Sequence, residues 1–141
     1  MEDISLHILD VVENSIRAGA DRIEVKLKGD NSNEKNIVLY IIDDGSGMDE
    51  KTLGIVTSPF YSSKKGKNFG MGISLLKQAA LETGGDFFIN SKPGSGTSIK
   101  AVFKSDHPDM KPLGDIKLTM RMLRLSHPEI DFVYKFENDS V

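Results

Sequence analysis

Apolar residues recur along residues 4–18 with the period of an α-helix. On a wheel of about 100° per residue, one half holds Ile4, Ile8, Leu9, Val11, Val12, Ser15 and Ile16. The other half holds the polar residues His7, Asp10, Glu13, Asn14 and Arg17. Gly19 follows at a position where glycine commonly ends a helix. The pattern therefore predicts an amphipathic helix with its apolar half against a core.

Two strands are predicted after this helix. Residues 22–28 alternate between polar and apolar types, and the polar residues 29–35 predict a hairpin turn. Residues 37–42 form an uninterrupted apolar run, which predicts a strand buried on both faces. The run leads directly into the sequence DDGSG at residues 43–47, so it places the Asp43 carboxylate at the edge of the core.

The rest of the chain alternates between helical and strand patterns. The expected helices are residues 49–56, 70–83 and 115–126, and the expected strands are 86–91, 97–104 and 131–137. Residues 57–69 carry Ser, Lys, Gly and Pro without clear periodicity and are expected to form a loop. This order predicts an α/β two-layer sandwich, in which helices cover one face of a mixed sheet.

The character of the chain changes at Ser105. We expect residues 1–104 to form the main domain and residues 105–141 to form a helix–strand extension packed on it. The extension's helix carries two apolar stripes: Ile116, Met120 and Leu123 form one, and Leu118, Met122 and Leu125 form the other. One stripe can pack on the domain and leave the other for a partner protein or a second copy. Alternatively, the extension is a cap that only completes the core.

Composition narrows the function classes. At 141 residues the chain is long enough for one domain, and a net charge of −3 gives no electrostatic reason to expect nucleic acid as a partner. The absence of cysteine excludes disulfides and thiolate metal sites. The first residues, MEDISLH, lack the positive charges of a signal peptide, and no apolar run is long enough to span a membrane. We therefore expect a cytoplasmic protein without a membrane segment.

Three places in the chain hold candidate chemistry. Asp10 and Asn14 lie one helical turn apart, where an amide oxygen suits Mg²⁺ and a carboxylate can take a proton. Asp43 needs donors if it is buried, and a ligand amine could be one of them. Gly70-Met71-Gly72 precedes a helix N-terminus, where phosphates bind readily. Each place also has a plain structural interpretation: a polar helix face, a strand-ending turn and a loop-to-helix hinge.

Taken together and in this order, these segments resemble the nucleotide-binding domain shared by gyrases, heat-shock chaperones, histidine kinases and mismatch-repair ATPases. This is the GHKL superfamily, whose domain has the Bergerat fold. ENSIRAGADRIEV at residues 13–25 is similar to the mismatch-repair sequences, and DDGSGM at 43–48 matches the Asp-x-Gly-x-Gly motif. SPFYSSKKGKNFGMGISLLK at 58–77 is more similar to histidine kinases, and GSGTSIKAVF at 94–103 matches the closing strand. The resemblance covers residues 4–104 and implies an ATP-binding domain at residues 1–104.

The resemblance implies ATP and Mg²⁺ as cofactors and a role for each motif residue. Asn14 would hold Mg²⁺, Asp43 would accept the adenine amine, and Thr97 would support the same edge of the base. The backbone around base and phosphates would come from Gly45, Gly47, Met48, Gly70, Met71 and Gly72, and Lys64, Lys65 or Lys67 would reach the terminal phosphate. Asp10 would be the catalytic base, but it stands where the ATP-hydrolysing branches carry the longer Glu. Asn68 likewise replaces a glycine usual in histidine kinases.

The function implied is a histidine-kinase-like protein that transfers the γ-phosphoryl group of MgATP to a His or Ser of a partner protein in trans. The partner is expected because the helical hairpin with a phosphoacceptor histidine is missing, and His7, His107 and His127 are poor substitutes. One alternative is a slow or non-catalytic ATP-responsive module that regulates a partner. Another is an ATPase of the chaperone or repair type. A homodimer through the extension is also consistent with the sequence.

Overall fold

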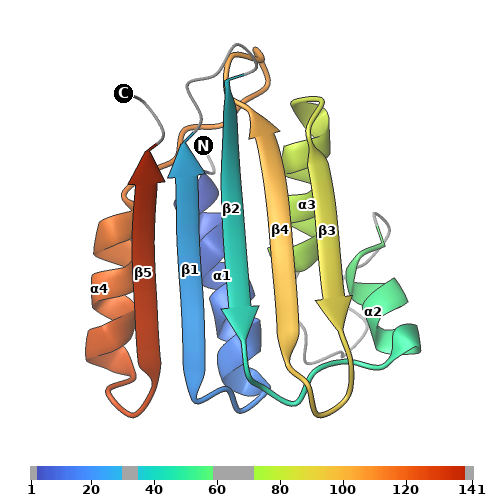
Figure 1. Cartoon of the computed structure of the whole chain (residues 1–141), viewed down its shortest axis with the longest axis vertical. Helices are drawn as coiled ribbons and strands as arrows, with labels where there is room; N and C mark the ends of the chain where they lie inside the picture. The colour runs from blue at the N-terminus through green and yellow to red at the C-terminus, as the bar shows by residue number, and fades with distance from the viewer. Residues whose placement is uncertain (1–2, 30–34, 59–71, 139–141) are drawn as a thin grey trace.

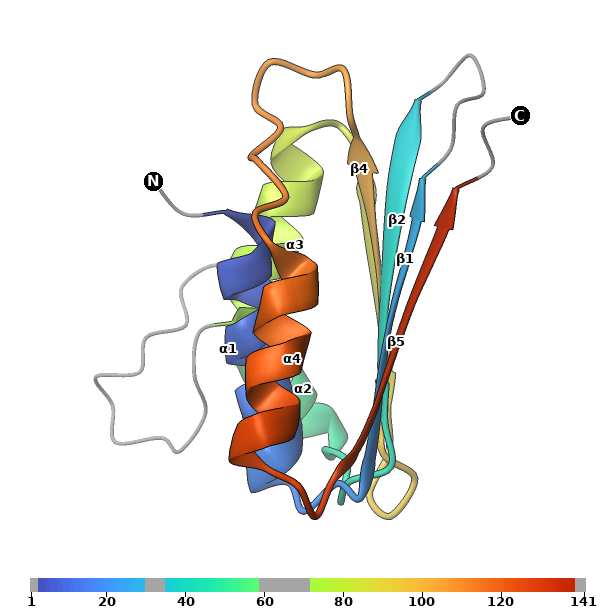
Figure 2. The same ribbon diagram turned by 90° about the vertical axis from the view of Figure 1, so that its left-hand side faces the viewer.

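The computed structural model of this protein describes residues 3–29, 35–58 and 72–138. In this part of the chain, helices cover one face of a five-stranded sheet and leave the other face open (Figures 1 and 2). The predicted α/β two-layer sandwich with a mixed sheet is therefore confirmed. The elements are α1 (Ile4–Arg17), β1 (Arg22–Gly29), β2 (Asn36–Asp43), α2 (Glu50–Val56), α3 (Gly72–Glu82), β3 (Asp86–Ser91), β4 (Thr97–Lys104), α4 (Ile116–Ser126) and β5 (Asp131–Asn138).

Every helix and strand expected from the sequence is present, with small shifts at the ends. Most of the predicted hairpin turn at 29–35 and of the predicted loop at 57–69 lies outside the described residues. The sheet order is β3-β4-β2-β1-β5, in which β5 pairs parallel with β1 and the other pairs are antiparallel. The β2–β4 register sets Asp43 opposite Thr97, so two predicted site residues meet at one end of the sheet.

The core lies between α1 and the covered face of the sheet. Buried residues of α1 (Ile4, Ile8, Val11 and Val12) meet alternate residues of the strands (Ile23, Val25, Leu39, Ile41, Ile99 and Phe103). The helix is positioned at its start by Asp3, whose side chain accepts a hydrogen bond from the Leu6 N–H at 3.1 Å. The helical period of α1 and the alternating period of the strands therefore mark the residues that face each other in one core.

The prediction that β2 is buried on both faces is wrong. Only Leu39 and Ile41 are buried in this strand, and Ile42 is 41% exposed on the open face. Tyr40 also lies on the open face, where the ammonium groups of Lys26 and Lys100 are 5.8 and 5.9 Å from its ring centroid. No helix of the described part covers the open-face residues of β2. Their apolar character is explained by contacts with neighbouring side chains across the sheet.

The polar half of α1 is also less exposed than its wheel suggests. His7 is only 2% exposed, although the wheel places it among the polar residues. The helix α3 packs closely against the polar half of α1: a Cβ on Gly72 would lie 2.7 Å from the Asp10 Cβ and 2.8 Å from the Val11 nitrogen. A helix wheel reports one apolar face, whereas α1 is covered both by the sheet and by a neighbouring helix.

The C-terminal segment completes both layers. All of β5 pairs with β1, from Arg22 opposite Asp131 to Gly29 opposite Asn138. Of the two predicted stripes on α4, Ile116, Met120 and Leu123 are the buried ones. In Figure 1, α4 lies along the outer edge of β5.

Replacing Met120 by Ala should destabilise the fold strongly, because Met120 is 1% exposed and its removal leaves a cavity. Core substitutions of this type cost about 2–5 kcal/mol in the free energy of unfolding. The matched control is Met122→Ala on the same helix, where the side chain is 58% exposed, and its effect should stay within about 0.5 kcal/mol. Urea unfolding curves measure both, and equal effects would contradict this account of α4.

Candidate functional site

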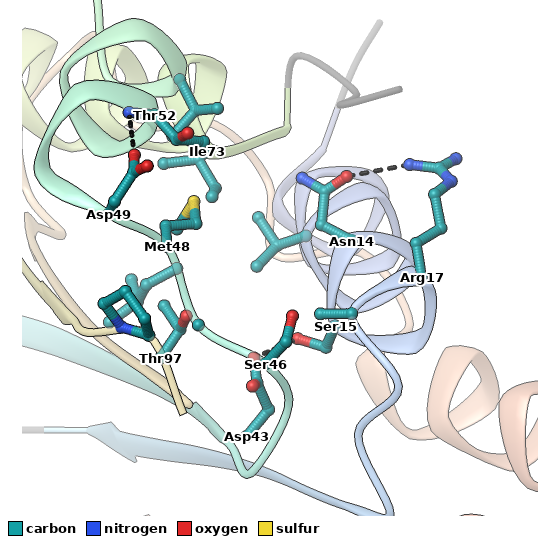
Figure 3. Close-up of a pocket in the computed structure, with 16 residues that line it drawn as sticks. Asn14, Ser15, Arg17, Asp43, Ser46, Met48, Asp49, Thr52, Ile73 and Thr97 are labelled. Atoms are coloured by element: carbon teal, nitrogen blue, oxygen red, sulfur yellow. Dashed lines mark hydrogen bonds between the residues drawn. The ribbon is translucent and has the colours of Figure 1, made fainter. Parts of the chain in front are cut away.

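A pocket of about 420 Å³ lies at the end of the sheet where β2 ends. It is bounded by α1, α2, the start of α3 and the strand β4 (Figure 3). Its volume is in the usual range for small-molecule sites. Apolar side chains (Val11, Met48, Val56, Ile73 and Ile99) form much of the wall, and the polar groups include Asn14, Ser15, Asp43 and Thr97. A flat apolar ligand with a few polar edges would suit this lining.

The Asp43 carboxylate is held on both oxygens. Its Oδ2 accepts a hydrogen bond from the Ser15 Oγ at 2.6 Å (Figure 3). Its Oδ1 accepts one from the Gly45 N–H at 2.9 Å. Each carboxylate oxygen can accept a second hydrogen bond. Asp43 is therefore an oriented acceptor at the pocket wall.

Sequence reasoning missed Ser15 as a site residue. It was counted with the apolar half of α1, and it is indeed 4% exposed. A buried hydroxyl needs a hydrogen-bond partner, and a serine at a core position of an amphipathic helix was the available signal. That its partner is Asp43, 28 positions later, follows only from the packing of α1 on the sheet.

Thr97 and Met48 are joined through Ser91. The Ser91 hydroxyl lies 2.8 Å from the Thr97 hydroxyl and accepts a hydrogen bond from the Met48 N–H at 2.9 Å. Thr97 is thereby oriented at the pocket, and the loop after β2 is attached to the hairpin of β3 and β4. No sequence signal pointed to Ser91, because its role arises from strand pairing.

Glycines let the loop after β2 lie against that hairpin. Gly47 has φ +73°, and a Cβ there would lie 2.0 Å from the Lys92 carbonyl oxygen. A Cβ on Gly96 would lie 2.1 Å from the Asp43 carbonyl oxygen. Side chains at either position would therefore separate the two segments that carry Asp43 and Thr97.

The side chain of Asp44 makes different contacts from those of its neighbour Asp43. Its Oδ1 accepts hydrogen bonds from the backbone N–H groups of Asp21 at 2.8 Å and Arg22 at 3.0 Å. The N–H groups of Arg22 and Asp21 favour the ionised form and lower the pKa of the Asp44 carboxyl below its usual value. Asp44 therefore attaches the turn between α1 and β1 to the loop that follows Asp43.

Asn14 and Arg17 occupy another wall of the pocket. The Arg17 Nη1 donates a hydrogen bond to the Asn14 Oδ1 at 2.9 Å (Figure 3). An amide oxygen has two lone pairs, so Asn14 can accept a metal or a second donor as well. Arg17 was not predicted as a site residue, although its position three residues after Asn14 places it on the same side of the helix.

The pocket brings together Asn14, Asp43, Gly47, Met48 and Thr97 among the predicted residues. Asp10, Gly45 and Gly72 do not line it, although Gly45 supports Asp43 and Gly72 packs against Asp10. Asp10 is exposed, one turn before Asn14 on α1. The predicted residues Lys64, Lys65, Lys67, Gly70 and Met71 lie outside the described residues.

Within residues 3–29, 35–58 and 72–138, no group of three or more His, Asp or Glu side chains could hold a metal ion. None of the helices in the same ranges combines the length and the apolar character needed to cross a bilayer.

Comparison with known sequences assigns most of the chain to one family. Residues 2–107 match the histidine kinase-, DNA gyrase B- and HSP90-like ATPases. The sensor histidine kinase CssS of Bacillus subtilis (strain 168) is 36% identical over 69 residues, which are 49% of this chain and 14% of that kinase. The sensor histidine kinase YxdK of the same organism is 31% identical over 100 residues, which are 66% of this chain and 30% of that kinase. This chain spans less than a third of the length of either relative.

The fold is also that of a solved ATPase domain. The structure is similar to the ATPase domain of Aquifex aeolicus MutL, determined in complex with ADP, with a TM-score of 0.61 at 14% identity. The similarity covers 98% of this chain and 61% of the MutL chain. The Bergerat-type α/β fold expected from the sequence is thereby confirmed.

Replacing Asp44 by Asn should make stability less dependent on acid pH. The lowered pKa means that the ionised carboxylate stabilises the fold above its ordinary pKa of about 4, and that this contribution is lost as the pH falls through the lower folded value. The wild-type chain should therefore melt at a higher temperature than Asp44→Asn at neutral pH, and the two should converge in acid. Circular dichroism melts across this pH range measure the gap, and a gap independent of pH would contradict the assignment.

Proposed function

This chain belongs to the family of histidine kinase-, DNA gyrase B- and HSP90-like ATPases, and we propose that it binds ATP with Mg²⁺ in the pocket beside Asp43. The observation that carries the proposal is the Asp43 carboxylate, held by Ser15 and Gly45 at the wall of a largely apolar pocket. Such a group recognises an amine on a flat aromatic ring.

Adenine fits this acceptor better than guanine does. An ionised carboxylate only accepts hydrogen bonds, so it pairs with the amino group of adenine and repels the carbonyl oxygen that guanine carries in its place. Ile73, Ile99 and Met48 supply the apolar wall that the base would contact. Thr97, which Ser91 orients, would support the same edge of the base.

Asn14 and Arg17 would serve the phosphate end of the nucleotide. The Asn14 amide oxygen is a hard, neutral ligand of the kind Mg²⁺ accepts, and Mg²⁺ typically takes further oxygens from phosphates and water. Mg²⁺ would neutralise phosphate charge, and the Arg17 guanidinium beside Asn14 is placed to do the same. The contributions predicted for Lys64, Lys65, Lys67, Gly70, Met71 and Gly72 stay predictions.

We propose further that the γ-phosphoryl group passes to a His or Ser of a partner protein. In this step the bond between the γ-phosphorus and the bridging oxygen breaks, ADP leaves with that oxygen, and a P–N or P–O bond forms on the acceptor. The acceptor's proton needs a base, and Asp10 is exposed one turn before Asn14. Similarity to sensor histidine kinases supports this proposal.

A slower, regulatory role is the second candidate. Asp10 does not line the pocket, and its side chain is one methylene shorter than the Glu of ATP-hydrolysing relatives. Both features favour a module without rapid ATP turnover, in which bound nucleotide changes the affinity of this protein for a partner protein. The two candidates share the same ATP pocket and differ in whether phosphate leaves the nucleotide.

Replacing Asp43 by Asn should weaken ATP binding and reduce the preference for ATP over GTP. The change keeps the shape of the side chain but removes the charge, and hydrogen bonds to charged groups contribute about 1.5–3 kcal/mol, or roughly 10- to 150-fold in affinity. Isothermal titration calorimetry with both nucleotides measures it. The matched control is Asp49→Asn, which lines the same pocket but caps α2 by accepting the Thr52 N–H at 2.8 Å. Equal affinity of the wild-type chain for ATP and GTP would contradict the role of Asp43.

Phosphoryl transfer is tested by incubating the chain with γ-labelled ATP in an extract of the cells that produce it. We expect a labelled protein, acid-labile if the acceptor is His and acid-stable if it is Ser. Asp10→Asn should abolish the label and leave ATP affinity unchanged. Label recovered as inorganic phosphate would instead indicate an ATPase, and label retained on ATP would indicate the regulatory module.

A further inference from the structure

A second exposed surface lies on α4, away from the pocket. Leu118, Met122 and Leu125 are 48%, 58% and 76% exposed. They are spaced four and three residues apart, so they form one continuous stripe along the helix. We call these three residues the outer stripe of α4.

The outer stripe is not an unfinished part of the core. The opposite side of α4 carries Ile116, Met120 and Leu123, all at most 4% exposed, and these residues already attach the helix to the domain. Solvent-facing positions of a helix are normally polar. Three large apolar side chains in line on an 11-residue helix therefore indicate a contact made with something outside the chain.

Positive charge runs beside the outer stripe on one flank only. Lys117, Arg121 and Arg124 lie roughly 100° around the helix from the stripe, and α4 contains no acidic residue. The Arg124 Nη2 donates a hydrogen bond to the Phe132 carbonyl oxygen at 3.2 Å, so this basic flank faces β5. The other flank carries the uncharged Thr119 and Ser126. The whole chain is acidic, at −3, so the local positive charge is opposite to the overall charge.

The position of α4 makes this surface accessible. The helix lies along the outer edge of β5, and α2 lies near the opposite edge of the sheet (Figure 1). It lies on the helical layer, beside α1 (Figure 2). No residue of α4 or β5 lines the pocket. The family match ends at residue 107, before α4 begins, so the surface belongs to the part of the chain outside that match.

We propose that the outer stripe and the basic flank of α4 bind an amphipathic helix of a partner protein. The partner helix presents an apolar stripe to Leu118, Met122 and Leu125. A row of Asp or Glu on one side of that stripe faces Lys117, Arg121 and Arg124. This is helix-to-helix recognition with the register set by charge. The contact area of one short helix gives a transient rather than a permanent complex.

Charge argues against the two other occupants. In an antiparallel pair of α4 helices, a second copy of this chain would bring the same three cations against Lys117, Arg121 and Arg124, and like charges at an interface are unfavourable. In a parallel pair, each basic flank would meet the uncharged flank with Thr119 and Ser126, which offers the cations no carboxylate. An anionic bilayer would attract the cations but repel Asp115 and Glu129, which stand immediately before and shortly after the helix. Cations on a single flank match a neighbouring row of carboxylates more closely than they match a flat charged plane.

The test uses two synthetic helical peptides that differ only in charge. Both carry Leu at the spacing of the outer stripe, and one flank carries Glu in the first peptide and Lys in the second. Fluorescence anisotropy with the full chain, without nucleotide, should show the Glu peptide binding about tenfold more tightly or better. Because ATP is absent, failure here is distinct from failure of the proposed nucleotide function.

Matched variants locate the binding surface. Leu118→Ser should weaken binding of the Glu peptide at least tenfold, whereas Leu81→Ser on α3, with the same 48% exposure, should not change it. Arg121→Glu should reverse the preference toward the Lys peptide, and Lys28→Glu on β1 should not. All four substituted side chains lie outside the buried core, and circular dichroism confirms that each variant is folded.

Any of four outcomes overturns the proposal. The first is equal affinity for the two peptides, and the second is binding of neither. The third is binding to vesicles of phosphatidylserine and phosphatidylcholine that Leu118→Ser removes, which would indicate a membrane surface. The fourth is a dimer in sedimentation experiments that Leu118→Ser dissociates, which would indicate a second copy of the chain.

Discussion

The hydrogen bond between Ser15 and Asp43, at 2.6 Å, joins the first helix to the end of the central strand. It links the two layers of the sandwich at the pocket, which both residues line. Gly45 holds the other oxygen of the same carboxylate, and the β2–β4 register sets Thr97 opposite Asp43. The Asp43 carboxylate is thus positioned by elements from three separate parts of the chain.

The pocket and the helix α4 differ in their relation to the match with the ATPase family. The pocket is built from α1, β2, β4 and the segments around them, and all of these lie within the match to the ATPase family. The helix α4 and the strand β5 lie outside that match, yet they supply buried residues such as Met120 and Phe132. The inner side of α4 therefore contributes to the fold, which leaves its outer stripe available for a role particular to this chain.

Much of the fold could be predicted because it depends on local periods. The helical period of residues 4–18, the alternation in residues 22–28 and one of the two stripes of α4 each correspond to a face that is buried in the structure. Predictions about which faces are covered were less successful. His7 is buried although it lies on the polar half of α1, and Ile42 is exposed because no described helix lies over that side of the sheet. A periodic pattern reports that a face is apolar but not which neighbour covers it.

For the site, the sequence alone determined the residue types and their order: an Asn on a helix, an Asp after an apolar strand with glycines behind it, and a Thr on a later strand. Those features are local and could be compared with a known family. Only the tertiary structure decided that Ser15 and Gly45 hold Asp43, that Ser91 orients Thr97 and that Arg17 contacts Asn14. Hydrogen bonds with well-defined directions between distant segments depend on strand register and helix packing, and neither is expressed in any short stretch of sequence.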